Sequence, residues 1–282
     1  MLILPAVLAG CRGSIPEQVF TKTAPTTQPA FRDSTDDVWR PRAAEVSGAF
    51  VIDQTATLQV DQDSTTRTDT VASHTEFTMT RSRDGRIAGT ITAFRARAAG
   101  SPTGTPASTA PPAPFDASIS ADGIIHVPVP PGESPGAPCS GVTSAGVLAS
   151  RDLWFRLPDS LHPGSTWSDS SSTQTCRDGV PLRLSVRRRY VVERTERRDS
   201  VLVFIIRRTQ QLHLEGAGAQ WGERVRVTGS GSGTMTLAVA ARTEALLTAS
   251  GTSTLDLTFT GSRRTQRVHQ RLATEARGAE IK

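Results

Sequence analysis

The chain has 282 residues, which allows one large all-β domain or two small ones. A domain of this size can bury a core without a metal or several disulfides. The net charge is +5, but Lys occurs only at Lys22 and Lys282 and Tyr only once, a bias that a GC-rich genome explains without any ligand. Arg clusters such as Arg187-Arg188-Arg189 lack the interleaved aromatic residues that stack on bases, so the charge does not indicate nucleic-acid binding.

The chain begins with an apolar run that ends in Leu8-Ala9-Gly10-Cys11. This stretch resembles the lipobox of bacterial lipoproteins, a Leu-small-small-Cys sequence that is cut just before the cysteine. The resemblance implies that residues 1–10 are a short signal peptide, that Cys11 carries acyl chains (palmitate-type lipid), and that lipid ties the mature protein to a membrane. The alternative is an apolar N-terminus that docks on the fold, with a chance cysteine.

A lipid anchor of this kind predicts a place in the bacterial cell envelope, facing the periplasm. Arg12 follows the cysteine, whereas in lipoproteins of enteric bacteria an Asp there favours retention in the inner membrane; the outer membrane is therefore favoured. No other stretch of the sequence approaches the ~18 apolar residues that a membrane-spanning helix needs. The expected membrane contact is the N-terminal lipid.

Residues 11–45 are rich in Pro, Thr and Ala and show little periodicity. They predict a lipidated tether, which as a random coil would reach roughly 30 Å from the bilayer. Trp39 is a candidate for docking on the domain that follows. From residue 46 to 278 the pattern predicts a single β-rich domain, although the consecutive hairpins of its two halves leave a duplicated β-unit open.

Period-two alternation of apolar and polar residues predicts half-buried strands in the first half of the domain. Asp84-Gly85 and Asp122-Gly123 are hairpin-type turn signals. Between these two turns, residues 100–114 are rich in Pro, Thr, Ala and Gly and predict a flexible loop. The predicted strands are Thr57–Val60, Glu76–Thr80, Arg86–Arg97 and Phe115–Ser120.

The second half repeats the alternation more strongly. Val201 to Ile206 is a continuous apolar run that predicts a central strand covered on both faces. Val268 to Arg277 predicts a final strand or a short helix. One-sided burial is expected in the segments that carry Leu182 and Leu184, Leu212 and Leu214, Val225 and Val227, Met235 to Val239, and Leu255 to Phe259.

The fold class that follows is all-β, with room for one or two short helices, as an antiparallel meander forming a curved sheet or half-barrel. Leu157-Pro158, Pro163-Gly164-Ser165-Thr166-Trp167 and Gly229-Ser230-Gly231-Ser232-Gly233 together resemble a family of uncharacterised bacterial envelope lipoproteins. Those proteins are similar in outline to the lipoprotein-carrier half-barrels. The resemblance implies an antiparallel sheet that curls around an apolar cleft.

The segment Gly229 to Gly233 does not match a catalytic motif. A Gly is missing two residues before either Ser, so the nucleophile elbow Gly-x-Ser-x-Gly is not met. Thr234 replaces the last Gly of the dinucleotide fingerprint, and no helical pattern follows. The segment instead predicts a strand that bends sharply or lets a neighbouring backbone approach closely.

The remaining polar residues predict no catalytic site, no metal site and no cofactor. The five histidines are scattered, and the pair His213 and Glu215 on one strand face is the usual result of alternation. With Cys11 acylated, Cys139 and Cys176 are left as a pair in an oxidising compartment, where a disulfide is expected. On the chain-entropy model this bond stabilises the fold by roughly 3–4 kcal/mol. Two buried free thiols are the alternative.

Two functions are favoured, and an enzyme is not. The first is a non-enzymatic, lipid-anchored envelope lipoprotein whose curved sheet binds an apolar ligand or lipid. The second is a structural or protein-interaction module of the envelope, with an exposed aromatic patch around Trp154, Phe155 and Trp167 as its contact site; a buried core plug is the alternative for these aromatics. For the first function, the residues expected to line one concave apolar face are Leu182, Leu184, Val203, Ile205, Leu255, Leu257 and Phe259.

Overall fold

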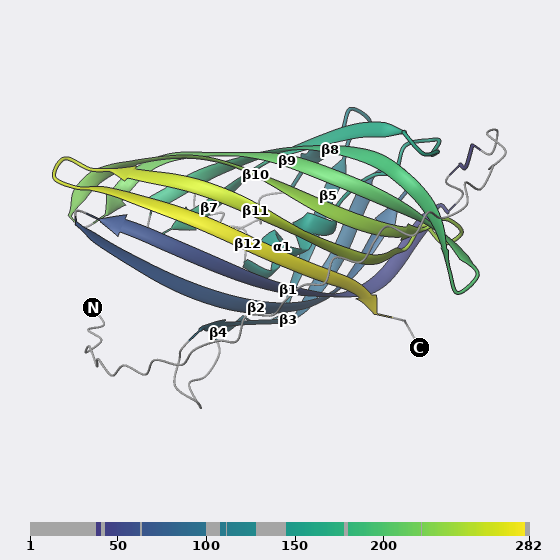
Figure 1. Ribbon diagram of the computed structural model, residues 1–282, viewed down its shortest axis with the longest axis horizontal. Helices are drawn as coiled ribbons and strands as arrows, with labels where there is room; N and C mark the ends of the chain where they lie inside the picture. The colour runs from purple at the N-terminus through teal and green to yellow at the C-terminus, as the bar shows by residue number, and fades with distance from the viewer. Residues whose placement is uncertain are drawn as a thin grey trace, which may run out of the picture. The chain divides into compact units, whose positions relative to one another are not determined.

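Long antiparallel strands make up most of the chain in the computed structural model (Figure 1). The structure describes residues 38–40, 43–62, 64–99, 108–110, 112–127, 145–177, 180–220 and 222–279, and these described residues belong to one compact unit. Its elements are β1 (Glu45–Gln62), β2 (Thr65–Ser82), β3 (Arg86–Ala98), β4 (Ser108–Ala110), β5 (Ala113–Ile119), β6 (Ile124–His126), α1 (Ala145–Ser150), the 3-10 turn η1 (Arg151–Leu153), β7 (Thr166–Arg177), β8 (Val180–Arg198), β9 (Val201–Gln220), β10 (Glu223–Ala240), β11 (Leu246–Thr260) and β12 (Thr265–Ala279).

The strands form one curved sheet that closes on itself. Its order is β2-β1-β12-β11-β10-β9-β8-β7-β6-β5-β3, and β3 pairs back onto β2, while β4 is added at the side of β3. Among the described strands, neighbours in this ring are antiparallel except β6 and β7, which are parallel over two residue pairs. The prediction of an all-β, antiparallel, curved sheet is therefore confirmed.

Two segments differ from the sequence-based expectation or settle an alternative. Ser108–Ala110 pairs with β3 as strand β4, and β5 begins at Ala113, so part of the predicted loop 100–114 is strand. The C-terminal segment that allowed either a strand or a helix is strand β12. Trp39, the candidate for docking on the domain, does so: its backbone exchanges two hydrogen bonds with Leu161, and its ring lies 5.2 Å from that of Phe204 between centroids.

Alternation along the strands sends one set of side chains into the ring. These inward residues form two apolar clusters at opposite ends of the long strands. The first cluster contains, for example, Phe204 and Ile206 near the start of β9, and the second contains Leu214 near its end. The same split is seen in β10, where Val225 lies at one end and Leu237 towards the other.

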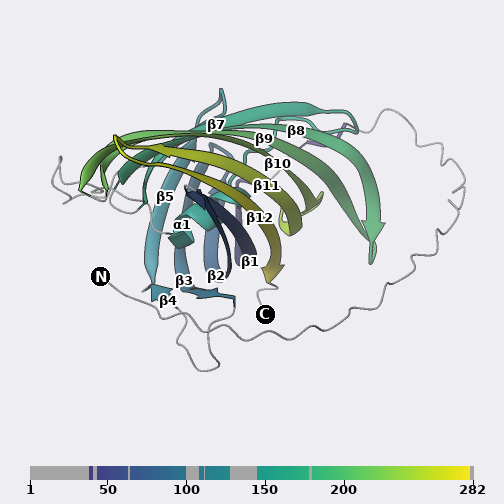
Figure 2. The same ribbon diagram turned by 60° about the vertical axis from the view of Figure 1, so that its left-hand side comes forward.

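Residues 145–165, the described part of the connection between β6 and β7 beyond residue 127, fill the first cluster from within. Figure 2 shows α1 lying inside the arc of strands, and Leu153 at the end of η1 and the following Trp154 and Phe155 are at most 1% exposed. No helix in the described part of the chain is long and apolar enough to cross a membrane. Of the two alternatives for these aromatic residues, the core plug is confirmed for Trp154 and Phe155, and Trp167 stacks on buried Tyr190 with 4.9 Å between ring centroids.

Both predicted Asp-Gly turns are present and share one construction. Gly85 and Gly123 have φ of +91° and +80°, which a residue with a Cβ adopts only under strain. In each turn a serine, Ser82 or Ser120, donates its hydroxyl to the Asp two residues later. The same serine oxygen accepts the backbone N–H four residues on, at 3.0 Å in both turns. The sequence pattern Ser-x-Asp-Gly thus closes β2–β3 and β5–β6 in the same way.

The three glycines at 229, 231 and 233 lie on the inward side of β10, between β9 and β11. A Cβ at Gly233 would lie 2.6 Å from the Cβ of Ser253, and one at Gly229 would lie 2.7 Å from the backbone oxygen of Asp256. The predicted close approach of a neighbouring backbone is confirmed. A consequence is that the inward face of β10 carries no side chains over this stretch, between its Val227 and Met235.

Candidate functional site

A cavity of about 290 Å³ lies between the two apolar clusters, on the inner side of the sheet. One wall is α1 with η1, and the others are the inward faces of β8, β9, β11 and β12, with contributions from β1 and β7. The cavity is bordered by the side-chain-free stretch of β10, because Leu212 and Leu255 flank Gly231 on its two sides. The lining residues are Gln54, Leu148, Ala149, Arg151, Asp152, Ser171, Leu184, Val186, Arg188, Gln210, Leu212, Ser253, Thr254, Leu255, Gln270 and Leu272.

The apolar part of this lining is only half-buried, although it points into the ring. Leu184, Leu212, Leu255 and Leu272 are inward residues of four different strands, and each keeps intermediate exposure. In a closely packed interior such residues would be fully covered. They therefore face empty space that an apolar group can fill.

Arginine side chains form the opposite, polar end. Arg188 of β8 is 5% exposed, and its Nε lies 2.6 Å from Oδ1 of Asp169 on β7. Tyr190 donates its hydroxyl to the other oxygen of Asp169 at 2.7 Å, and burial raises the pKa of this tyrosine. Arg188 also donates from Nη1 to the backbone oxygen of Arg151 at 3.0 Å, so this ion pair holds η1 in place.

A second buried arginine anchors the next residue of η1. Arg208 of β9 is 2% exposed and donates from Nη1 to the backbone oxygen of Asp152. Its Nη2 lies 3.2 Å from Oδ1 of the same residue, whose side chain is 24% exposed. The carboxylate of Asp152 is therefore paired with Arg208, and it can offset the charge of a further cation only in part.

Arg151 itself is the third arginine at this end and lines the cavity. It is 7% exposed and donates from Nη1 to the hydroxyl of Thr173 at 2.5 Å, while its Nε has no hydrogen-bond partner. Burial lowers the pKa of Arg151 to about 10, and repulsion from Arg188 acts in the same direction. Gln210, which is paired with Arg188 across the strands, also has a buried side-chain oxygen without a partner.

Five of the seven residues predicted to line one apolar face lie on the inner face, in two roles. Leu182, Leu257 and Phe259 belong to the second apolar cluster, and Leu184 and Leu255 pack against it and line the cavity.

Val203 and Ile205 do not share this face, so the single-face expectation is wrong for them. They form a separate buried cluster with Ala238, because the inward positions at this end of β9 are taken by Phe204 and Ile206. The predicted strand covered on both faces is confirmed for Val203 to Ile206, whereas Val201 and Leu202 at its start are 41% and 39% exposed.

Sequence reasoning missed the arginines, whose clusters were interpreted as compositional. The signal was present in the alternation: Arg188 has the same parity as Leu182, Leu184 and Tyr190, whereas Arg187 and Arg189 point outward and are exposed. A charged residue at an inward position is rare unless it is paired or functional.

The cysteine predictions lie largely outside the described residues. Cys11 and Cys139 are not among them, and of Cys176 only its place in strand β7 is described. The lipid anchor and the disulfide therefore stay predictions. Within the described ranges, no three His, Cys, Asp or Glu side chains are close enough to hold a metal ion together, and His213 lies 3.8 Å from Glu215 with both side chains exposed.

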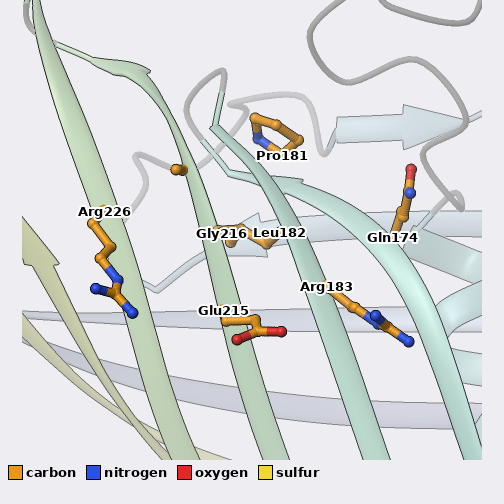
Figure 3. Close-up of a pocket in the computed structure, with 8 residues that line it drawn as sticks. Gln174, Pro181, Leu182, Arg183, Glu215, Gly216 and Arg226 are labelled. Carbon is orange, nitrogen blue, oxygen red and sulfur yellow. The ribbon is translucent and has the colours of Figure 1, made fainter.

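A second hollow of about 500 Å³ lies over β7 to β10, near the second apolar cluster (Figure 3). Arg183, Glu215 and Arg226 reach it from three neighbouring strands, and all three are exposed. It is an open groove in which solvent screens these charges. The interior cavity is the stronger candidate, because its polar groups are buried and converge.

The comparisons with known proteins leave the family open. No known family matches the chain, and no curated protein matches it. Among solved structures, Pseudomonas aeruginosa OccK2 (OpdF) is similar with a TM-score of 0.27 and 6% identity, covering 82% of this chain and 98% of that one. A mutant of the Rh. blastica porin is similar with a TM-score of 0.20 and 9% identity, covering 83% and 100%. Likenesses this distant carry no argument about fold or function.

Proposed function

We propose that this protein is a non-enzymatic, lipid-anchored lipoprotein of the bacterial envelope that holds an apolar ligand inside its curved sheet. The observation that carries the binding role is the interior cavity of about 290 Å³ with its half-buried leucines. This volume is at the lower end of small-molecule sites, which span ~300–1,000 Å³. It suits a single acyl chain and is small for a two-chain lipid.

The anchor and the location rest on the lipobox resemblance at Cys11. Acylation is tested by growing cells with a labelled fatty acid and comparing the full chain with Cys11→Ser. We expect label on the wild-type chain only. An unlabelled wild-type chain would remove the anchor, and with it the argument for an outer-membrane, periplasm-facing location.

Ligand binding is tested on the full chain carrying Cys11→Ser, which cannot be acylated at that residue. We expect saturable uptake of the neutral apolar dye nile red, with displacement by dodecanol. Leu212→Trp puts a bulky side chain into the cavity and should abolish uptake, whereas Gln211→Trp, on the exposed face of the same strand, should not. Equal uptake by both variants, or none by the parent, would refute an interior site.

The alternative function, a protein-interaction module, has lost the feature that suggested it. Of the aromatic residues expected at its contact site, Trp154 and Phe155 form the buried plug of the first cluster, and Trp167 of β7 is partly buried against that cluster. The binding role is therefore the better supported of the two.

A further inference from the structure

The polar end of the cavity holds more positive than negative charge. Arg151, Arg188 and Asp152 line this end, and behind them Arg208 is paired with Asp152 and Asp169 with Arg188, which makes three buried guanidinium groups and two carboxylates. Asp169 is engaged by Arg188 and Tyr190, and Asp152 by Arg208. One positive charge is left over, and by the hydrogen bonds it is that of Arg151.

An uncompensated charge in a buried position is expensive, so a protein rarely keeps one without a use for it. Arg151 is held by a neutral partner, Thr173, and has an Nε with no hydrogen bond. Burial and then repulsion from Arg188 lower the pKa of Arg151 to about 10, while the charge of Asp152 acts in the opposite direction, and the group stays protonated at neutral pH. An anion in the cavity would supply what the chain itself does not.

With distance from Arg151 and Arg188, the side chains on the inner face change from charged and polar to apolar. Along β8 the inward residues run from Arg188 through Val186 to Leu184. Along its partner β9 they run from Gln210 to Leu212, paired with Arg188 and Val186 respectively. At ~3.3 Å per residue, the change from cation to leucine on β8 takes about 13 Å. A ligand that matches this surface is anionic at one end and apolar at the other.

We propose that the cavity binds a single-chain carboxylate amphiphile, a free fatty acid, with its carboxylate on Arg151 and its chain directed towards Leu184, Leu212 and Leu255. This rests on the proposed function and names its ligand class. Arginine pairs with a carboxylate through charge-assisted, often bidentate hydrogen bonds. Gln210 can assist, because rotation of its amide presents either a donor or an acceptor.

The head group is tested first on the full chain carrying Cys11→Ser, by displacement of nile red with ligands of one chain length. Dodecanoate should bind at least ~10-fold more tightly than dodecanol, which has the same tail without the charge. Dodecyl phosphate separates a carboxylate site from a general anion site and should bind more weakly than dodecanoate. Equal affinity for dodecanoate and dodecanol, or tighter binding of the phosphate, would overturn the proposal while leaving an apolar site intact.

A variant series assigns the effect to Arg151. Arg151→Met should remove the preference for dodecanoate but keep binding of dodecanol, and Arg151→Lys should restore part of it. Arg187→Met, outward on β8 and exposed, is the matched control and should keep the full preference. If Arg151→Met does not fold, Gln210→Leu should still reduce the ratio of the two affinities. A ratio unchanged in the folded variants would place the carboxylate elsewhere. If neither ligand binds the parent chain, the proposed function itself fails.

Discussion

Replacing Asp169 with Asn tests whether the buried ion pair holds the interior together. Asp169 is the acceptor for both Arg188 and Tyr190, at 2.6 and 2.7 Å, and the two charged side chains are only 3% and 4% exposed. Asn has nearly the same shape but no charge, so after Asp169→Asn the carboxylate left near Arg188 and Arg151 is Asp152, which is already paired with Arg208.

Breaking a buried pair by removing one partner costs ~3–5 kcal/mol. At ~2–4 °C per kcal/mol for a domain of this size, the melting temperature should fall by roughly 6–20 °C. Thermal and urea unfolding, followed by circular dichroism, measure both quantities. Because Arg188 holds the backbone of η1, the cavity should also lose its shape, and nile red uptake should fall in parallel.

The matched control is Asp256→Asn, which removes an exposed acid from an ion pair with His269. It should change stability by less than ~1 kcal/mol. The double variant Asp169→Asn/Arg188→Met removes both charges and should recover ~0.5–3 kcal/mol relative to the sum of the single changes. A cost for Asp169→Asn no larger than that of the exposed control would refute the reasoning.

Three further predictions concern other parts of the chain. Gly231→Val should cost ~1–3 kcal/mol or more in urea unfolding, because its Cβ would meet the backbone oxygen of Thr254, while outward Ser230→Val should be tolerated. His74 donates hydrogen bonds to the carboxylates of Asp53 and Glu76, and these bonds raise its pKa from the ordinary value of 6.5. Protonated His74 therefore stabilises the fold below pH ~6.5, and this stabilisation is lost as the pH rises through the higher folded pKa. His74→Asn should lower the melting temperature at pH ~5.5 and leave it unchanged at pH ~9. A larger decrease at pH ~9 than at pH ~5.5 would contradict the assignment. Finally, Cys139 and Cys176 should resist alkylation until reduced, as read by mass spectrometry, and reaction without reductant would show free thiols.

The sequence alone was sufficient for the strands and insufficient for the cavity. Alternation at residues such as Leu182 and Leu184, and the turn glycines Gly85 and Gly123, depend on local chemistry that a single chain displays. The pairing of β1 with β12 and the parallel contact of β6 with β7 join segments that are distant in the sequence, and no local pattern encodes them.

In an uninterrupted apolar run, only the structure shows which residues face the interior and which face outward. Val201 to Ile206 has no alternation, so Val203 and Ile205 were placed on the face that Phe204 and Ile206 occupy. The arginines at the cavity were readable in principle, since an inward arginine breaks the apolar series of β8. Their partners were not, because Asp152 and Asp169 come from other segments.

Among the described strands, the weakest junction of the ring is at β6, and we expect the molecule to open there first. β1 and β2 are joined along all eighteen residues of β1, whereas β6 holds β5 by two residue pairs and β7 by two. Local openings begin where the fewest hydrogen bonds must break. Backbone amides around Ile125 and Ser171 should therefore exchange with deuterium before those of β9. Because Ser171 also lines the cavity, the same fluctuation sets an upper limit on how fast a ligand can enter or leave by that side.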